Sequence, residues 1–154
     1  MLIALAASLA AGAAAGHDTE HSMAAHAPAS LPAFGRAADA TKATRGITID
    51  MSDRLRFTPA EVSVRKGEMV RFAVSNSGKL EHEFVLGTLP ELKEHARIMQ
   101  QHAGMAHDAP HMARVPPGKA RSLTWQFTES GEFYYGCLVP GHFEAGMLGR
   151  IVVR

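Results

Sequence analysis

Apolar and polar residues alternate in several short runs between Ile47 and the C-terminus, and this pattern limits the chain to a β-rich fold. Such alternation is typical of strands with one buried face. Turn-forming residues at 66–68 and 76–78 separate some of these runs. Several short strands joined by close turns predict an all-β sandwich or barrel. The residues that define the runs are Ile47, Ile49 and Met51; Val62 and Val64; Val70, Phe72 and Val74; His82, Phe84 and Leu86; Leu123, Trp125 and Phe127; Phe133, Tyr135 and Cys137; and the segment 149–153.

One segment has the helical period instead. Thr88 and Glu91 have the spacing of a capping box, and Pro90 suits a first helical turn. We therefore predict a single helix, inserted between strands, that ends near Gln101. The apolar residues that recur at helical intervals are Leu89, Leu92, Ala96 and Met99.

The N-terminus resembles an export signal. An apolar run at 2–9 precedes small residues up to Gly16, with an A-x-A pattern at 13–15, although no basic residue follows Met1. A bilayer-spanning helix needs about 20 apolar residues, so this run is too short. We predict a signal peptide over 1–16, export to the periplasm of a Gram-negative bacterium and no membrane anchor after cleavage. A buried helix of the folded domain is the alternative.

The segment 17–46 is rich in Ala and Pro and has no sustained period, which predicts a flexible tail before a domain over 47–154. Loose copper capture by this tail is a weaker alternative to plain disorder. The residues that could take part are His17, His21, Met23 and His26.

Charge and cysteine content narrow the function classes. Lys and Arg total 16 against 15 Asp and Glu, so no strong field would attract nucleic acid. Nine His and eight Met accompany a single Cys. In an exported protein a lone thiol is buried, joined to another chain or bound to a metal.

The segment 134–147, YYGCLVPGHFEAGM, favours the metal-bound alternative. Its Cys137, His142 and Met147 offer a thiolate, an imidazole and a thioether, a soft donor set that suits copper better than calcium or magnesium. His82 begins a predicted strand on the same face as Phe84, so we expect it to be the fourth ligand. Two His and one Cys in a plane, with a weak axial Met, make a type 1 copper site.

Each of these residues also has a purely structural interpretation. Cys137 could be a small buried hydrophobe, His142 a surface histidine and His82 a satisfied core histidine. Met147 could only pack the loop, in which case water or a backbone carbonyl would be the axial ligand. Zinc could use the same Cys and His residues, although a thioether is a poor zinc ligand.

The C-x4-H-x4-M loop with an upstream His resembles the cupredoxin family of plastocyanin and azurin. More narrowly, HEFVLG at 82–87 and CLVPGHFEAGM at 137–147 resemble the CopI-type periplasmic cupredoxins of copper tolerance. The similarity covers 47–154. It implies a Greek-key β-sandwich with copper at one end, and ligands that match the family positions: His82, Cys137, His142 and Met147.

One residue departs from the plastocyanin-like pattern. Those proteins usually carry Asn after the first His ligand, where this chain has Glu83. Hydrogen bonding around the thiolate is therefore expected to differ. We predict that Glu81 and Glu83 form a solvated strand face; the alternative is that they raise the local affinity for cations.

Further His and Met residues suggest a second, softer site. His95, Met99 and His102 can share one helix face, and four more such residues follow in a predicted loop. Thioether and imidazole donors favour Cu(I). The alternative, equally weighted, places Met99 in the core and the histidines in solvent. The loop residues are Met105, His107, His111 and Met112.

Two functions fit this set of residues. A periplasmic protein of copper tolerance would bind copper and sequester it or pass it on, and the additional His and Met residues favour this function. The alternative is a mobile one-electron carrier. A periplasmic redox or copper-transfer protein is the expected partner.

An enzyme is disfavoured, and no catalytic residue is predicted. Multicopper oxidases place His on both sides of the type 1 Cys, where this chain has Gly136 and Leu138. A modest Cu(I)-oxidising activity is the remaining alternative if the second site exists.

Overall fold

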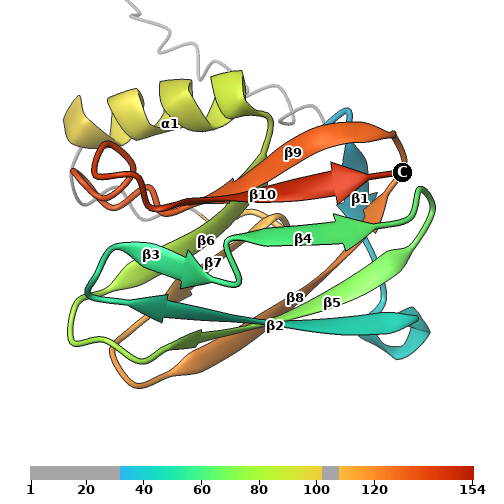
Figure 1. Cartoon of the computed structure of the whole chain (residues 1–154), viewed down its shortest axis with the longest axis horizontal. Coiled ribbons are helices and arrows are strands. Elements are labelled where there is room, and N and C mark those ends of the chain that lie inside the picture. The colour runs from blue at the N-terminus through green and yellow to red at the C-terminus, as the bar shows by residue number, and fades with distance from the viewer. Residues whose placement is uncertain (1–31, 102–107) are drawn as a thin grey trace, which may run out of the picture. The chain divides into compact units, whose positions relative to one another are not determined.

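Two five-stranded sheets enclose an aromatic core in the computed structural model, which describes residues 32–101 and 108–154 (Figure 1). The first sheet has the order β1-β8-β5-β2-β3 and the second the order β4-β10-β9-β6-β7. The strands are β1 Gly35–Ala37, β2 Arg45–Ser52, β3 Arg56–Thr58, β4 Glu61–Val64, β5 Met69–Asn76, β6 His82–Gly87, β7 Met112–Val115, β8 Ala120–Phe127, β9 Gly131–Gly136 and β10 Leu148–Val153.

The predicted all-β sandwich with one inserted helix is confirmed. Pairs β2–β5 and β4–β10 are parallel and the other neighbours are antiparallel. Phe84 lies near the middle of the core, with its ring centroid 5.3 Å from that of Phe72 and 5.2 Å from that of Tyr135. Each large aromatic side chain buries about 150–250 Å² of surface, so these rings contribute strongly to the core.

The helix α1, Leu89–Gln101, begins with the predicted capping box: the Glu91 carboxylate accepts the Thr88 N–H at 2.8 Å. Its buried face packs against Val85 and Leu138, so α1 covers the side of the second sheet that faces away from the first (Figure 1). Every residue of β6 is therefore buried. In the described ranges no helix is long and apolar enough to cross a membrane. The buried helix residues are Leu92, Ala96 and Met99.

The domain begins earlier than predicted. Phe34 is buried and its ring lies 5.1 Å from that of Phe133, while β1 pairs with β8, so this part of the predicted tail belongs to the sandwich. A short 3₁₀ helix, Ala40–Lys42, and the first residues of β2 also precede position 47. A lone Phe in an Ala-rich segment was too weak a periodic signal to reveal this. The predicted signal peptide 1–16 and the tail residues 17–31 lie outside the described residues.

Two strands were also missed. β3 has only three residues, and β7 begins at Met112, inside a predicted loop. Both are too short for alternation to distinguish them from turns. They are nevertheless important for the site, because β3 follows the turn next to His82 and β7 pairs directly with β6.

Candidate metal centre

Strand pairing brings His82 and Cys137 together at one end of the second sheet, where interior strands β6 and β9 meet. His82 is the first residue of β6 and Cys137 follows the last residue of β9. Because β6 and β9 are antiparallel neighbours, with Val85 opposite Gly136, the start of one lies beside the end of the other. The loop 137–147 then returns the chain to β10, which pairs with β9.

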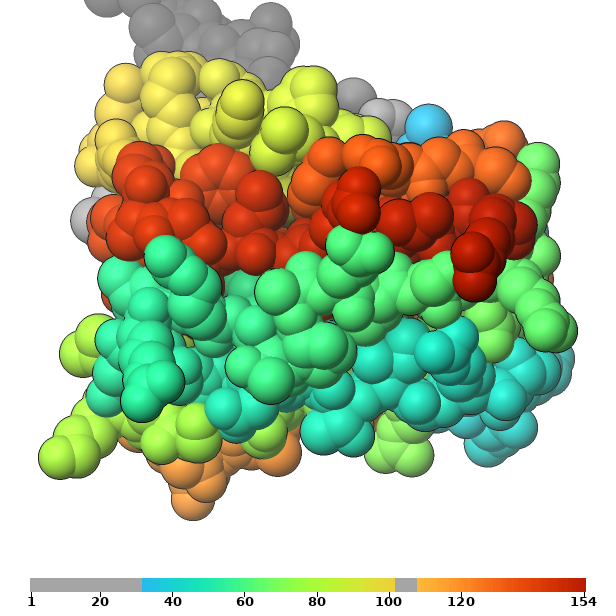
Figure 2. Space-filling view, viewed as in Figure 1, coloured from blue at the N-terminus to red at the C-terminus, as the bar shows by residue number. Residues whose placement is uncertain are grey.

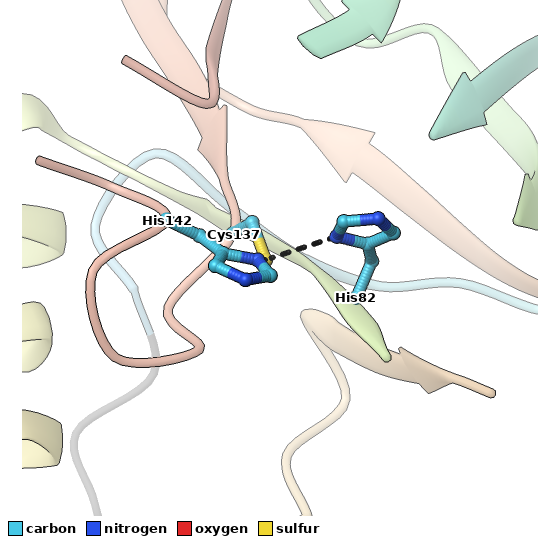
Figure 3. Close-up of side chains that lie close together, drawn as sticks. All are labelled: His82, Cys137 and His142. Carbon is cyan, nitrogen blue, oxygen red and sulfur yellow. Dashed lines mark hydrogen bonds between the residues drawn. The ribbon is translucent and has the colours of Figure 1, made fainter. Parts of the chain in front are cut away.

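Three ligand atoms converge there. The Cys137 Sγ lies 3.9 Å from Nδ1 of His82 and 3.3 Å from Nδ1 of His142, and Figure 3 shows the sulfur between the two rings. All three residues offer ligand atoms within 4.8 Å of one another, and this is the one such cluster of His, Cys, Asp and Glu in 32–101 and 108–154. Atoms bonded at about 2.0–2.3 Å to one ion are at most about 4.5 Å apart, so the sulfur–nitrogen distances of 3.3 and 3.9 Å suit a shared metal.

His82 is fully buried, and burial lowers the pKa of its imidazole despite the opposing charge of Asp53. A neutral ring with a lone pair on Nδ1 is the form that binds metal. Its other nitrogen, Nε2, has no hydrogen-bond partner within the described part of the chain. Oδ1 of Asp53 lies 3.6 Å from it, longer than an ordinary hydrogen bond.

The Cys137 sulfur is also buried and accepts the backbone N–H of Glu83 at 3.3 Å. Burial raises the pKa of the thiol to about 11, while the N–H groups of Glu83 and Val139 oppose that shift. In the metal-free protein the thiol therefore carries a proton at neutral pH. A metal that binds the thiolate must release this proton.

Local hydrogen bonds fold the ligand loop. The backbone of Met147 bonds to both of the other predicted ligands in the loop. Its N–H donates to the His142 carbonyl at 3.0 Å, and its carbonyl accepts the Cys137 N–H at 3.1 Å. Gly141 and Gly146 adopt φ values of 86° and 87°, which favour glycine. The predicted motif thus forms a closed turn with all three residues held by its own backbone.

The side chain of Met147 is fully buried in the same core cluster as Cys137. A thioether buried beside this loop is compatible with the predicted axial ligand. His142, by contrast, is half-buried, so it is the more exposed of the two histidines. Burial also lowers the pKa of His142.

Arg56 holds the loop from the side of the β2–β3 turn. Its Nη1 donates to the Ala145 carbonyl at 2.9 Å and to the Leu55 carbonyl at 2.7 Å. In Figure 2 the segment around β3 lies directly against the C-terminal segment that contains the loop. This contact joins the loop to a region about 90 residues earlier in the chain.

The prediction that Glu83 faces solvent is wrong. Its side chain is 2% exposed, whereas that of Glu81 is 43% exposed. Arg114 on β7 donates two bonds to one oxygen of Glu83, at 3.0 and 3.2 Å, and also pairs with Glu81 at 3.5 Å. The error arises because β7 was not predicted. Strand β6 was expected to have one solvent-exposed face, but α1 and β7 cover that face.

The proposed second copper site is only partly within the described residues. His102, Met105 and His107 lie outside them, so the site stays a prediction. Met99 is buried in the α1 cluster and Met112 packs against the same cluster. His95 is half-buried on α1, and the His111 ring lies 6.1 Å from that of Trp125.

Asp53, Arg56 and Arg114 all contact the site, and sequence analysis identified none of them. Each comes from a segment that is distant in sequence from the residue it contacts, so spacing carries no signal. Only the pairing of β6 with β7 and the position of the β2–β3 turn reveal them.

A family model described as copper binding proteins, plastocyanin/azurin family, matches residues 43–154. The chain belongs to this family. The convergent His–Cys–His cluster of this plastocyanin/azurin-family protein is consistent with a type 1 copper site, because thiolate and imidazole donors suit copper.

Curated relatives of this family member carry a copper-resistance name. The "Copper-resistant cuproprotein CopI" of Rubrivivax gelatinosus is 50% identical over 141 residues, which cover 91% of this chain and 86% of that one. The protein of the same name from Pseudomonas aeruginosa is 36% identical over 156 residues, 82% of this chain and 86% of that one. The chain therefore spans most of the length of these relatives.

Solved structures agree on the fold. Dithionite-reduced auracyanin from Roseiflexus castenholzii superposes with a TM-score of 0.62 at 20% identity, covering 71% of this chain and 96% of that one. At this identity the likeness concerns the fold alone, and it supports the cupredoxin architecture of this plastocyanin/azurin-family protein.

Proposed function

We propose that this protein is an exported, periplasmic copper-binding protein that acts in copper tolerance. One type 1 copper would be held by His82, Cys137 and His142, with Met147 as a weaker fourth ligand. The convergence of the three His and Cys ligand atoms within 4.8 Å carries this proposal. When bound, the copper supplies reversible one-electron chemistry between Cu(II) and Cu(I).

The chain's own groups prepare this site. The Glu83 N–H points at the sulfur and orients one lone pair, while burial keeps both imidazoles neutral. The Met147 backbone closes the loop, which brings its side chain to the same end of the core as Cys137. Together these groups hold a soft, water-poor donor set in place before any metal enters.

Similarity to a relative favours copper tolerance over other functions of such a site. The relative at 50% identity is named for copper resistance and matches nine-tenths of the chain. The additional His and Met residues of the chain, several of them outside the described ranges, would serve a protein that collects copper better than one that only passes electrons.

The ligand assignment is tested by replacing Cys137 with Ser. The copper-loaded variant should lose the intense visible absorption that a copper–thiolate bond produces. His111→Ala is the matched control, because this histidine lies outside the cluster. A Cys137→Ser protein that keeps the band would falsify the assignment.

The biological role needs a separate test in cells. Deletion of the gene should make cells sensitive to copper, and a wild-type copy, but not Cys137→Ser, should restore growth. Fractionation of the same strains should recover the wild-type protein in the periplasm. Normal copper resistance of the deletion strain, or recovery of the protein in the cytoplasm, would contradict the proposal.

The half-buried position of His142 favours one second candidate, a mobile electron carrier. An imidazole ligand that reaches the surface offers a short path for an electron to a partner protein. Deletion would then impair respiration or photosynthesis and leave copper resistance intact, a result that reverses the expected phenotype.

The second Cu(I) site stays a prediction of the sequence. Anaerobic titration of the wild-type protein should give more than one bound Cu(I). Met105→Leu should lower the stoichiometry, and a ratio of one that is unchanged in this variant would argue against the site.

A further inference from the structure

The Nε2 side of the His82 ring, opposite the Nδ1 atom that faces Cys137, lies next to a carboxylate. Nε2 of His82, buried and without a hydrogen-bond partner in 32–101 and 108–154, lies 3.6 Å from Oδ1 of Asp53. Asp53 follows the last residue of β2, in the turn that leads to β3. A buried ring N–H strongly favours an acceptor, and this oxygen needs to move by only a few tenths of an ångström to become one.

Asp53 is itself held in place by the backbone just before His82. Its carboxylate accepts the Lys79 N–H at 2.8 and 2.9 Å and the Leu80 N–H at 3.1 Å. A side chain at Gly78 would overlap this carboxylate, so the absence of a Cβ there lets the segment wrap closely around it. The N–H groups of Lys79 and Leu80 thus hold this carboxylate in one orientation beside the His82 ring.

A carboxylate at Nε2 has two chemical consequences for a ligand that binds through Nδ1. It places the ring proton on Nε2, which leaves the Nδ1 lone pair available and directed at Cys137. Its negative charge also raises the basicity of the ring, which stabilises Cu(II) more than Cu(I). Asp53 would therefore set both the orientation of His82 and the reduction potential of the site.

We propose that Asp53 is a positioning residue of the copper site, whose carboxylate accepts the Nε2–H of His82 and thereby fixes Nδ1 toward the metal. The proposal rests on the assignment of His82 as a ligand. The competing explanation is purely structural, since the contacts with Lys79 and Leu80 alone would give Asp53 a role in folding this segment.

Two variants separate these explanations. Asp53→Asn keeps an oxygen that can accept the Lys79 and Leu80 N–H groups but removes the charge, whereas Asp53→Ala removes both. Asp50→Asn is the matched control, because it removes a nearby charge from β2 that bonds the hydroxyls of Ser75 and Ser77 rather than the ring.

The measurements are the copper dissociation constant, the reduction potential and the exchange rate of the His82 Nε2–H in the diamagnetic Cu(I) protein. Asp53→Asn should raise the potential, speed proton exchange and weaken Cu(II) binding about 10-fold to 100-fold, the usual effect of losing such a partner. Asp53→Ala should do all three more strongly and also lower the unfolding midpoint. Asp50→Asn should leave proton exchange unchanged.

Two results would overturn the proposal. One is an Asp53→Asn protein with the wild-type potential, copper affinity and proton exchange. The other is an equal shift of the potential in Asp50→Asn, which would mean that only the overall charge matters. Failure of the ligand assignment itself is distinguishable, because His82→Ala would then keep the full visible spectrum of the loaded protein.

Discussion

The two segments that form the metal centre are positioned by different kinds of contact. Strand β6, which lies between β7 and β9 in the sheet, holds His82, and every residue of the strand is buried. The loop 137–147 is held mainly by its own backbone, with bonds among residues that are three to ten positions apart. Long-range packing fixes one histidine, and local turns fix the other three predicted ligands.

Because of this difference, we expect β6 to determine mainly the stability of the fold and the loop to determine mainly the geometry of the copper site. Changes around β6 remove packing that the whole sandwich shares, so they should affect unfolding most. Changes in the loop alter a local turn, so they should affect copper retention and spectrum while the fold survives. The variants below test this division between the two segments.

Phe84→Ala should have the largest effect. This ring is fully buried between Phe57, Phe72 and Tyr135, and its removal leaves a cavity in the core. Urea unfolding of the metal-free protein should give a loss of about 3–5 kcal/mol. Phe143→Ala is the counterpart in the loop, and because that ring is half-buried we expect a loss of about 1–2 kcal/mol. Equal losses would contradict the comparison.

Arg114→Met should have the next largest effect, because it leaves the buried Glu83 carboxylate without its partner. We expect a loss of about 1–3 kcal/mol, less than for a wholly buried pair since Arg114 is 39% exposed. Arg97→Met is the control: it breaks an exposed pair with Glu94 on α1, and its urea unfolding midpoint should stay close to that of the wild type.

Glu83→Gln identifies the origin of that loss. Combined with Arg114→Met, it removes the buried charge, so the double variant should be more stable to urea than Arg114→Met alone. A double variant as unstable as the single one would mean that Arg114 acts through packing of its apolar stem instead.

The same division explains what the sequence could predict. The loop ligands were identifiable because Cys137, His142 and Met147 lie close together in sequence, so their spacing reports directly on the turn they form. The principal strands and α1 were also predicted, since alternation and capping are local signals. His82 was found through its strand face and the family resemblance rather than through spacing.

What the sequence could not predict depends on contacts between distant segments. Asp53 reaches the site from the β2–β3 turn, Arg56 from the first residue of β3, and Arg114 through the pairing of β7 with β6. The burial of Glu83 followed from that same pairing. Phe34 escaped notice for a similar reason, because its partners on β8 and β9 lie about 90 to 100 positions later.

Gly141→Ala should affect the loop in preference to the fold. Gly141 has a φ of 86° with open space at the Cβ position, and Gly67, in the turn between β4 and β5, has a φ of 82° with the same open space. Adding a Cβ at such a φ costs about 1 kcal/mol, so both variants should lose a similar amount in urea unfolding.

Only Gly141→Ala should also change the copper site. The residue precedes His142, so a relaxed φ would turn this imidazole relative to the Cys137 sulfur and shift the visible bands. Gly67→Ala should keep the wild-type spectrum. A wild-type spectrum in both variants would mean that the metal, rather than the turn, determines the position of His142.

Arg56→Met should have the smallest effect on stability and a selective effect on copper. The exposed guanidinium donates to the Ala145 carbonyl, so its loss should lower the free energy of unfolding by less than about 1 kcal/mol. The loop would open more readily, and copper transfer to a chelator should become several-fold faster.

Arg45→Met is the control, because Arg45 makes the same kind of bond, to the Ser63 carbonyl at 2.7 Å, from the opposite end of β2. Arg45→Met should have the same free energy of unfolding in urea as Arg56→Met. It should transfer copper to a chelator at the wild-type rate. If both variants released copper at the same rate, the loop would need no support from the β2–β3 turn, and its own backbone bonds would account for its shape.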